Sequence, residues 1–100
     1  MRRVYDVKNF RITTEIINFD LSGESIVVPL KESGSTILTQ TDPNNLQIYE
    51  LDHNGIGIHW PVLDEDLSIE GLLRSAGRQY LIVEHQLPNW YHQETSAKAS

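Results

Sequence analysis

The chain has 100 residues, of which 39% are hydrophobic, and it carries a formal net charge of -6. This length predicts one domain with a single modest core, and no apolar run reaches the roughly 20 residues of a membrane-spanning helix. The sequence contains no cysteine, which excludes a disulfide framework, a thiolate zinc site and a cysteine nucleophile. The start, MRRVYD, lacks the apolar stretch of a signal peptide, so we expect a cytoplasmic protein.

The charges are unevenly distributed along the chain. Four of the eight basic residues precede residue 12, and none lies between Lys31 and Arg74. That stretch carries the carboxylates of Glu32, Asp42, Glu50, Asp52, Asp64, Glu65, Asp66 and Glu70. A surface of this sign repels nucleic acid and attracts basic partners, although acidic side chains also keep small domains soluble. We therefore expect no direct binding of nucleic acid and no membrane association.

The first part of the chain predicts a β-hairpin. Residues 11–20 are rich in Ile, Thr and Phe and are typical of a strand. Leu21–Glu24 is a turn around a glycine that can adopt a positive φ. Residues 25–30 alternate in hydrophobicity, and their apolar face consists of Ile26, Val28 and Leu30. Pro29 cannot donate a ladder hydrogen bond, so this strand ends there or lies at an edge.

The middle of the chain predicts short helices and a second hairpin. Ser35 is a suitable cap for a short helix, and Asp42-Pro43 is typical of a helix that extends to about Leu46. Asn54-Gly55 is the preferred central pair of a type I′ turn. Counting outward from it gives a core face of Tyr49, Leu51, Ile58 and Trp60. The opposite face places Glu50 beside His59.

The last predicted helix runs from Ile69 to Ala76. Ser68 is its N-cap, with Gly71 at the third helical position, and the preceding acids of residues 64–66 suit the positive helix end. Gly77 is a natural stop. We expect a single domain over residues 1–77 and a C-terminal extension over residues 78–100, in which the apolar run 80–83 could add a strand and the last residues are disordered. The predicted fold class is α+β, a small antiparallel sheet built from two β-hairpins with one or two short helices.

Residues 57–73, GIHWPVLDEDLSIEGLL, resemble the signature of the domain of unknown function 2442 family. Members typically show Gly-Ile-His-Trp-Pro, then Leu-Asp-Glu-Asp, then Ser-Val-Glu-Gly-Leu-Leu, and the resemblance covers roughly residues 14–74. The chain departs from the family at residues 31–34, where many relatives carry an aromatic-Pro-Arg segment. The resemblance implies a small bacterial, largely cyanobacterial α+β domain. Such domains are often encoded beside a small basic protein in a toxin–antitoxin-like arrangement, with this domain as the antitoxin.

The candidate partner-binding residues combine an apolar extension with an acidic run. They are Tyr80, Ile82, Trp90 and Tyr91 as anchors, and Asp64, Glu65 and Asp66 as the surface that attracts a basic partner. An alternative is that the extension folds back and completes the core of the domain. A second function also stays open: a self-associating structural or ligand-binding domain that forms a homodimer through its sheet edge.

The signature residues are interpreted as structural: His59, Trp60, Pro61, Ser68 and Gly71. Trp60 fills the core and needs a partner for its ring N–H. A third and less favoured reading makes His59 and the acids of residues 64–66 a metal or catalytic site, but the acids lack the alternating spacing of a calcium loop. We expect a non-catalytic binding module without cofactor or metal.

Overall fold

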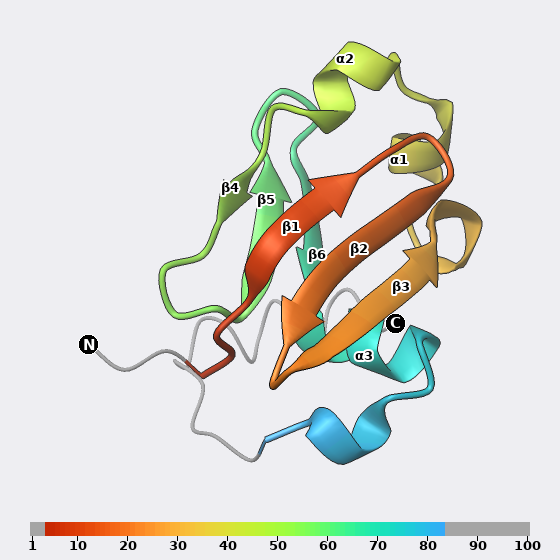
Figure 1. Ribbon diagram of the computed structural model, residues 1–100. Coiled ribbons are helices and arrows are strands. Elements are labelled where there is room, and N and C mark those ends of the chain that lie inside the picture. The colour runs from red at the N-terminus through yellow and green to blue at the C-terminus, as the bar shows by residue number, and fades with distance from the viewer. Residues whose placement is uncertain (1–3, 84–100) are drawn as a thin grey trace, which may run out of the picture.

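The computed structural model describes residues 4–83, which form two three-stranded antiparallel sheets and three short α-helices. The first sheet contains β1 (Lys8–Ile12), β2 (Ile16–Leu21) and β3 (Glu24–Pro29), and the second contains β4 (Glu50–Leu51), β5 (Gly57–Trp60) and β6 (Glu65–Ser68). The α-helices are α1 (Thr36–Gln40), α2 (Pro43–Leu46) and α3 (Ile69–Ser75). In Figure 1 one sheet lies in front of the other, with α1 and α2 toward one end and α3 at the opposite end. The predicted α+β class and both predicted hairpins are confirmed, and each hairpin is completed by a third strand.

The first hairpin closes with a type I′ turn, the type that the sequence predicts for the second hairpin. Ser22 and Gly23 connect β2 to β3, and both have positive φ, 53° and 80°. Two positive φ angles in a two-residue loop define a type I′ turn, which matches the twist of the flanking strands. The cross-strand pairs behind it place four side chains in the core: Ile17 with Val28, and Phe19 with Ile26.

The prediction of one strand over residues 11–20 is wrong. The chain reverses at residues 13–15, and the Thr13 side-chain oxygen accepts hydrogen bonds from the backbone N–H groups of Glu15 and Ile16, both at 3.1 Å. A threonine hydroxyl that bonds its own backbone stabilises a turn rather than an extended segment. The residues before it form β1, which pairs with β2 at the edge of the sheet.

The register of the second hairpin is as predicted, but its turn is not. Leu51 pairs with Ile58 and Glu50 with His59. The turn starts one residue earlier than expected, because the Asp52 carbonyl accepts from the Gly55 N–H at 2.8 Å. Only Gly55 has a positive φ in this loop. The loop is shaped by the N-terminal segment, since the Asn54 carbonyl accepts from the Val4 N–H at 2.8 Å.

The sequence suggested that the acids of residues 64–66 interact with the N-terminus of the following helix. In the structure they lie before and within a strand instead. Glu65 and Asp66 lie in β6 and pair with Trp60 and His59 of β5. Asp64 adopts a positive φ of 51° in the reversal between the two strands, a conformation that aspartate tolerates better than most residues. Glu65 and Asp66 therefore belong to an additional strand, and Asp64 belongs to the turn that precedes it.

The helix caps are confirmed. The side-chain oxygens of Ser35, Asp42 and Ser68 accept from backbone N–H groups at the starts of α1, α2 and α3. Gly77, at φ 73°, ends α3, and the Arg78 N–H then returns to the Leu73 carbonyl at 2.8 Å. Within residues 4–83, no helix is both long enough and apolar enough to cross a bilayer.

The core is joined across the two sheets by aromatic rings. Phe10 of β1 contacts Phe19 at a centroid distance of 6.3 Å and Tyr49 at 4.9 Å, and Tyr49 contacts Trp60 at 6.2 Å. Trp60 is fully buried, and its ring N–H donates to the Leu46 carbonyl at the end of α2 at 3.0 Å. Leu51, expected in the core, is 41% exposed, because β4 is a short edge strand.

The segment after α3 does not add a strand. Gln79–Leu81 forms one turn of 3₁₀ helix, and Leu81 and Ile82 pack against the core. The Val83 N–H donates to the Tyr5 hydroxyl at 2.9 Å. The start of the expected extension therefore packs on the domain, whereas the expected disorder at the terminus concerns residues outside those that the structure describes.

A glycine substitution tests the contact between the second hairpin and the N-terminal segment. Gly55 and Gly77 have the same φ, 73°, but a Cβ at Gly55 would lie 1.9 Å from the Tyr5 carbonyl oxygen, whereas one at Gly77 meets nothing within 4 Å. We expect Gly77→Ala to cost about 1–2 kcal/mol, the strain of a left-handed alanine. Gly55→Ala should cost at least twice as much in the free energy of unfolding, measured by urea denaturation. Equal costs would show that the loop moves freely away from Tyr5.

Tyr5 gives the fold a dependence on alkaline pH. Burial raises the pKa of its hydroxyl above the ordinary value of 10.0. The folded state thus holds this proton more tightly than the unfolded state, so the free energy of unfolding falls as the pH rises above about 10. Tyr5→Phe should make that fall shallower in thermal melts between neutral and alkaline pH, while lowering stability at pH 7 through the lost bond from Val83. If stability decreases with alkaline pH as steeply in Tyr5→Phe as in the wild type, the Tyr5 hydroxyl is not the cause of that decrease.

Candidate functional site

The outer face of the second sheet carries a row of three titratable side chains. Glu50, His59 and Asp66 are cross-strand partners on β4, β5 and β6, and directly opposed residues lie on the same face of a sheet. The His59 Nδ1 lies 2.6 Å from the Asp66 Oδ1, and the two side chains are about 40% exposed. The expected neighbour of His59 was Glu50. That opposition is confirmed, but the hydrogen bond is made to Asp66.

Asp52 extends this row into a surface. Its backbone N–H donates to the Gly57 carbonyl at 2.9 Å, which continues the β4–β5 ladder by one pair. Because side chains alternate along a strand, Asp52 lies on the same face as Glu50. We call this surface the acidic face; it consists of Glu50, Asp52, His59 and Asp66. No lysine or arginine occurs in β4, β5 or β6, or in α1 and α2.

Glu65 has a different role from its acidic neighbours. It pairs with the buried Trp60, and its carboxylate accepts a 2.5 Å hydrogen bond from the Ser35 hydroxyl. Ser35 is 5% exposed and also caps α1 by accepting from the Leu38 N–H at 3.1 Å. Glu65 therefore links β6 to the start of α1 through a hydrogen bond that its carboxylate accepts.

Among the described residues, the predicted anchor Tyr80 does not lie beside the predicted acids. Figure 1 shows β6 running from the reversal that holds Asp64 down to α3, and the 3₁₀ turn that holds Tyr80 lies beyond α3. Tyr80 is 68% exposed, and its hydroxyl donates to Glu24 at 2.5 Å. That hydrogen bond raises the pKa of Tyr80 above its ordinary value. Trp90 and Tyr91 lie outside the described residues.

The histidine and the acids do not form a recognisable metal centre. Across residues 4–83, no three His, Cys, Asp or Glu side chains gather in a geometry that could hold a metal ion. The acidic face offers one imidazole bound to one carboxylate, with no serine, threonine or cysteine in hydrogen-bond contact with His59 among the described residues.

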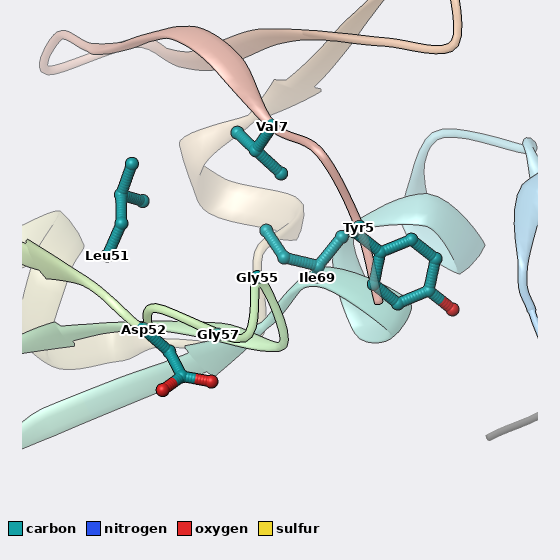
Figure 2. A pocket seen from close by; sticks show the side chains of 7 residues that line it. All are labelled: Tyr5, Val7, Leu51, Asp52, Gly55, Gly57 and Ile69. Carbon is teal, nitrogen blue, oxygen red and sulfur yellow. The ribbon is translucent and has the colours of Figure 1, made fainter. Parts of the chain in front are cut away.

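A small pocket opens between the second hairpin and the residues that lead into β1 (Figure 2). It encloses about 220 Å³, including space open to solvent, and is lined by Tyr5, Val7, Leu51, Asp52, Gly55, Gly57 and Ile69. Most of this volume is open solvent, and the space between the side chains is no larger than about one water molecule. In Figure 2 the side chains of Val7, Leu51 and Ile69 project into this space, whereas the Asp52 carboxylate points away from it. We call the space between these three side chains the apolar slot.

The comparison with known families agrees with this architecture. The family described as "Protein of unknown function (DUF2442)" matches residues 7–78. The chain belongs to this family. The match includes all the strands and α-helices described above, and it confirms the resemblance that the signature indicated. No curated protein and no solved structure matches the chain.

The residues of the family signature form β5, β6 and most of α3. Several of them make contacts that shape the fold. Trp60 is in the core, and Pro61 begins the reversal into β6. Ser68 caps α3, and a Cβ at Gly71 would lie 2.8 Å from the Ser68 hydroxyl oxygen. A larger residue at position 71 would therefore displace the cap. The sequence analysis missed the acidic face, although the alternation of residues 49–52 places Glu50 and Asp52 on one side.

Ser35 tests the attachment of α1 to the second sheet. Ser35→Ala removes the cap of α1 and leaves the Glu65 carboxylate without the bond that Ser35 donates. We expect a loss of about 1–3 kcal/mol in the free energy of unfolding, measured by urea denaturation. Thr39→Ala is the matched control, because its exposed hydroxyl bonds only within α1, and it should cost less than about 0.5 kcal/mol. Equal losses would mean that the Ser35–Glu65 bond contributes nothing.

Proposed function

We propose that this protein is a non-catalytic binding module that recognises a basic protein partner through the acidic face. The observation that supports the proposal best is the difference in charge between the sheets. The strands of the first sheet contain Lys8 and Arg11 together with Asp20 and Glu24, whereas the strands of the second sheet contain carboxylates and no lysine or arginine. A face of one sign raises the rate of encounter with partners of the opposite sign and excludes partners of the same sign.

The proposed binding surface differs from the one expected from the sequence. Glu65 is committed to Ser35, and Tyr80 donates its hydrogen bond to Glu24. Glu50 and Asp52, which were not singled out, stand on the acidic face beside His59 and Asp66. Within residues 4–83, the second sheet is therefore the better candidate than the 3₁₀ turn at Tyr80. The contribution of Trp90 and Tyr91 stays a prediction.

We extend the proposal to an antitoxin-like role in the cytoplasm. The resemblance implies a small basic protein encoded next to such domains, and an acidic face suits a partner of that charge. The mechanism is masking: the domain covers a basic surface that the partner needs for its own activity. This role requires no chemistry from His59, whose ring is held by Asp66.

Self-association is the second candidate. β3 is a six-residue edge strand, and its Val27 side chain is 48% exposed on the outer face of the first sheet. An exposed edge strand can pair with the same strand of another copy. A partner-free dimer would favour this function.

Charge-neutralising variants test the proposed function. The full chain is immobilised and used to capture proteins from a bacterial lysate, in parallel with Glu50→Gln/Asp52→Asn and with Glu15→Gln/Glu32→Gln. Both double variants lose two negative charges, but Glu15 and Glu32 lie outside the second sheet. We expect a small basic protein to be retained by the wild type and the control, and to be lost from the acidic-face variant. Its retention should decrease with added salt, because exposed ion pairs are screened.

Two results would count against the proposal. Equal retention by both double variants would show that net charge, rather than the acidic face, governs binding. If the purified chain has the mass of a dimer by light scattering and captures no basic protein, self-association becomes the better explanation.

A further inference from the structure

The outer edge of β4 is free to accept another strand. β4 is an edge strand of the second sheet, and among residues 4–83 no strand pairs with its outer side. Asp52 is hydrogen-bonded to Gly57 of β5. In an antiparallel pair, the residue next to a hydrogen-bonded one points its N–H and C=O away from the partner strand. The backbone groups of Leu51 therefore face outward, ready for one further pair of hydrogen bonds.

The two faces of this edge differ in character. Leu51 projects toward Val7 and Ile69 in the apolar slot, and it is 41% exposed. Glu50 and Asp52, its neighbours in the chain, lie on the acidic face. A strand added beside β4 would place the residue opposite Leu51 over the slot. The residues on either side of it would stand against the two carboxylates.

The geometry points to strand addition: a short extended segment of the basic partner pairs with the β4 edge through a basic–apolar–basic sequence. This inference rests on the proposed function and names the chemistry of the partner. The apolar residue packs against the exposed part of Leu51, and the two basic residues reach Glu50 and Asp52. Main-chain hydrogen bonds supply affinity in this mode of recognition, and the alternating side chains supply specificity.

The same residues disfavour a second copy at this edge. Antiparallel self-pairing centred on Leu51 would set Glu50 of one chain opposite Asp52 of the other, twice. Like charges directly opposite each other destabilise a β pair. The edge therefore rejects its own copy and accepts a basic strand, which is how charged residues protect edges from non-specific pairing.

The β3 edge is a poorer site for this partner. It is longer, but Pro29 has no N–H to donate. β3 carries a single carboxylate, Glu24, which already accepts a hydrogen bond from Tyr80. β4, with two residues, suits a short segment that depends on side-chain complementarity.

Peptide binding to the full chain tests the inference. The probes are a capped peptide that alternates lysine and valine, and a peptide of the same composition with the lysines and valines in separate blocks. We expect the alternating peptide to bind about tenfold more tightly by calorimetry, and the Leu51 amide to become protected from hydrogen exchange. Leu51→Gln should remove the preference for the alternating peptide. Ile48→Gln should keep it, because Ile48 is similarly exposed, at 47%, but does not line the slot.

The outcomes separate the inference from the proposed function. If both peptides bind equally, and both lose affinity with Glu50→Gln/Asp52→Asn, strand addition is wrong but the acidic face still binds basic partners. If the alternating peptide keeps its preference in Leu51→Gln, or the Leu51 amide stays unprotected, the edge is not the site. Binding unaffected by the acidic-face variant would count against the proposed function itself. A peptide-free dimer with a protected Leu51 amide would replace the basic partner with a second copy.

Discussion

The buried indole of Trp60 fixes the second sheet in place. Its ring is fully buried, touches Tyr49, and donates to the end of α2. An indole N–H left unpaired in a core is costly, so β5 can hold this ring in only one orientation and register. With Trp60 and Ile58 pointing inward, the period of two forces His59 outward. The acidic face is thus a geometric consequence of how the core is packed.

The family signature follows from the same constraint. Its acids serve two opposite purposes, because alternate residues of β6 face opposite sides of the sheet. Glu65 faces inward and binds Ser35, which ties α1 to the sheet, whereas Asp66 faces outward and binds His59. Ser68 and Gly71 then begin α3 in a geometry in which a side chain at position 71 would displace the Ser68 cap. Trp60, Glu65 and Ser68 of the signature thus each make a contact that shapes the fold.

The sequence predicted local features well and features that depend on distant contacts poorly. The hairpin register and the three helix caps follow from alternation and from single side chains near their own backbone, so they could be read directly. The turn at Gly55 could not, because its shape is set by Val4 and Tyr5, about fifty positions earlier in the chain. β6 was missed because acids are disfavoured in strands, and only pairing with β5 makes them extended. The acidic face required this third strand before it could be recognised as a surface.

The two sheets differ in how their charged and polar groups are compensated. On the first sheet, polar groups satisfy one another: Arg11 bonds Asn18, Asn18 bonds Ser25, and Asn9 bonds Asp20. The second sheet has no lysine or arginine in its strands to offset its carboxylates. Clustered charges of one sign repel each other and modestly destabilise the folded state. If the proposed function holds, a basic partner would relieve that repulsion on binding, and salt would weaken both the repulsion and the complex.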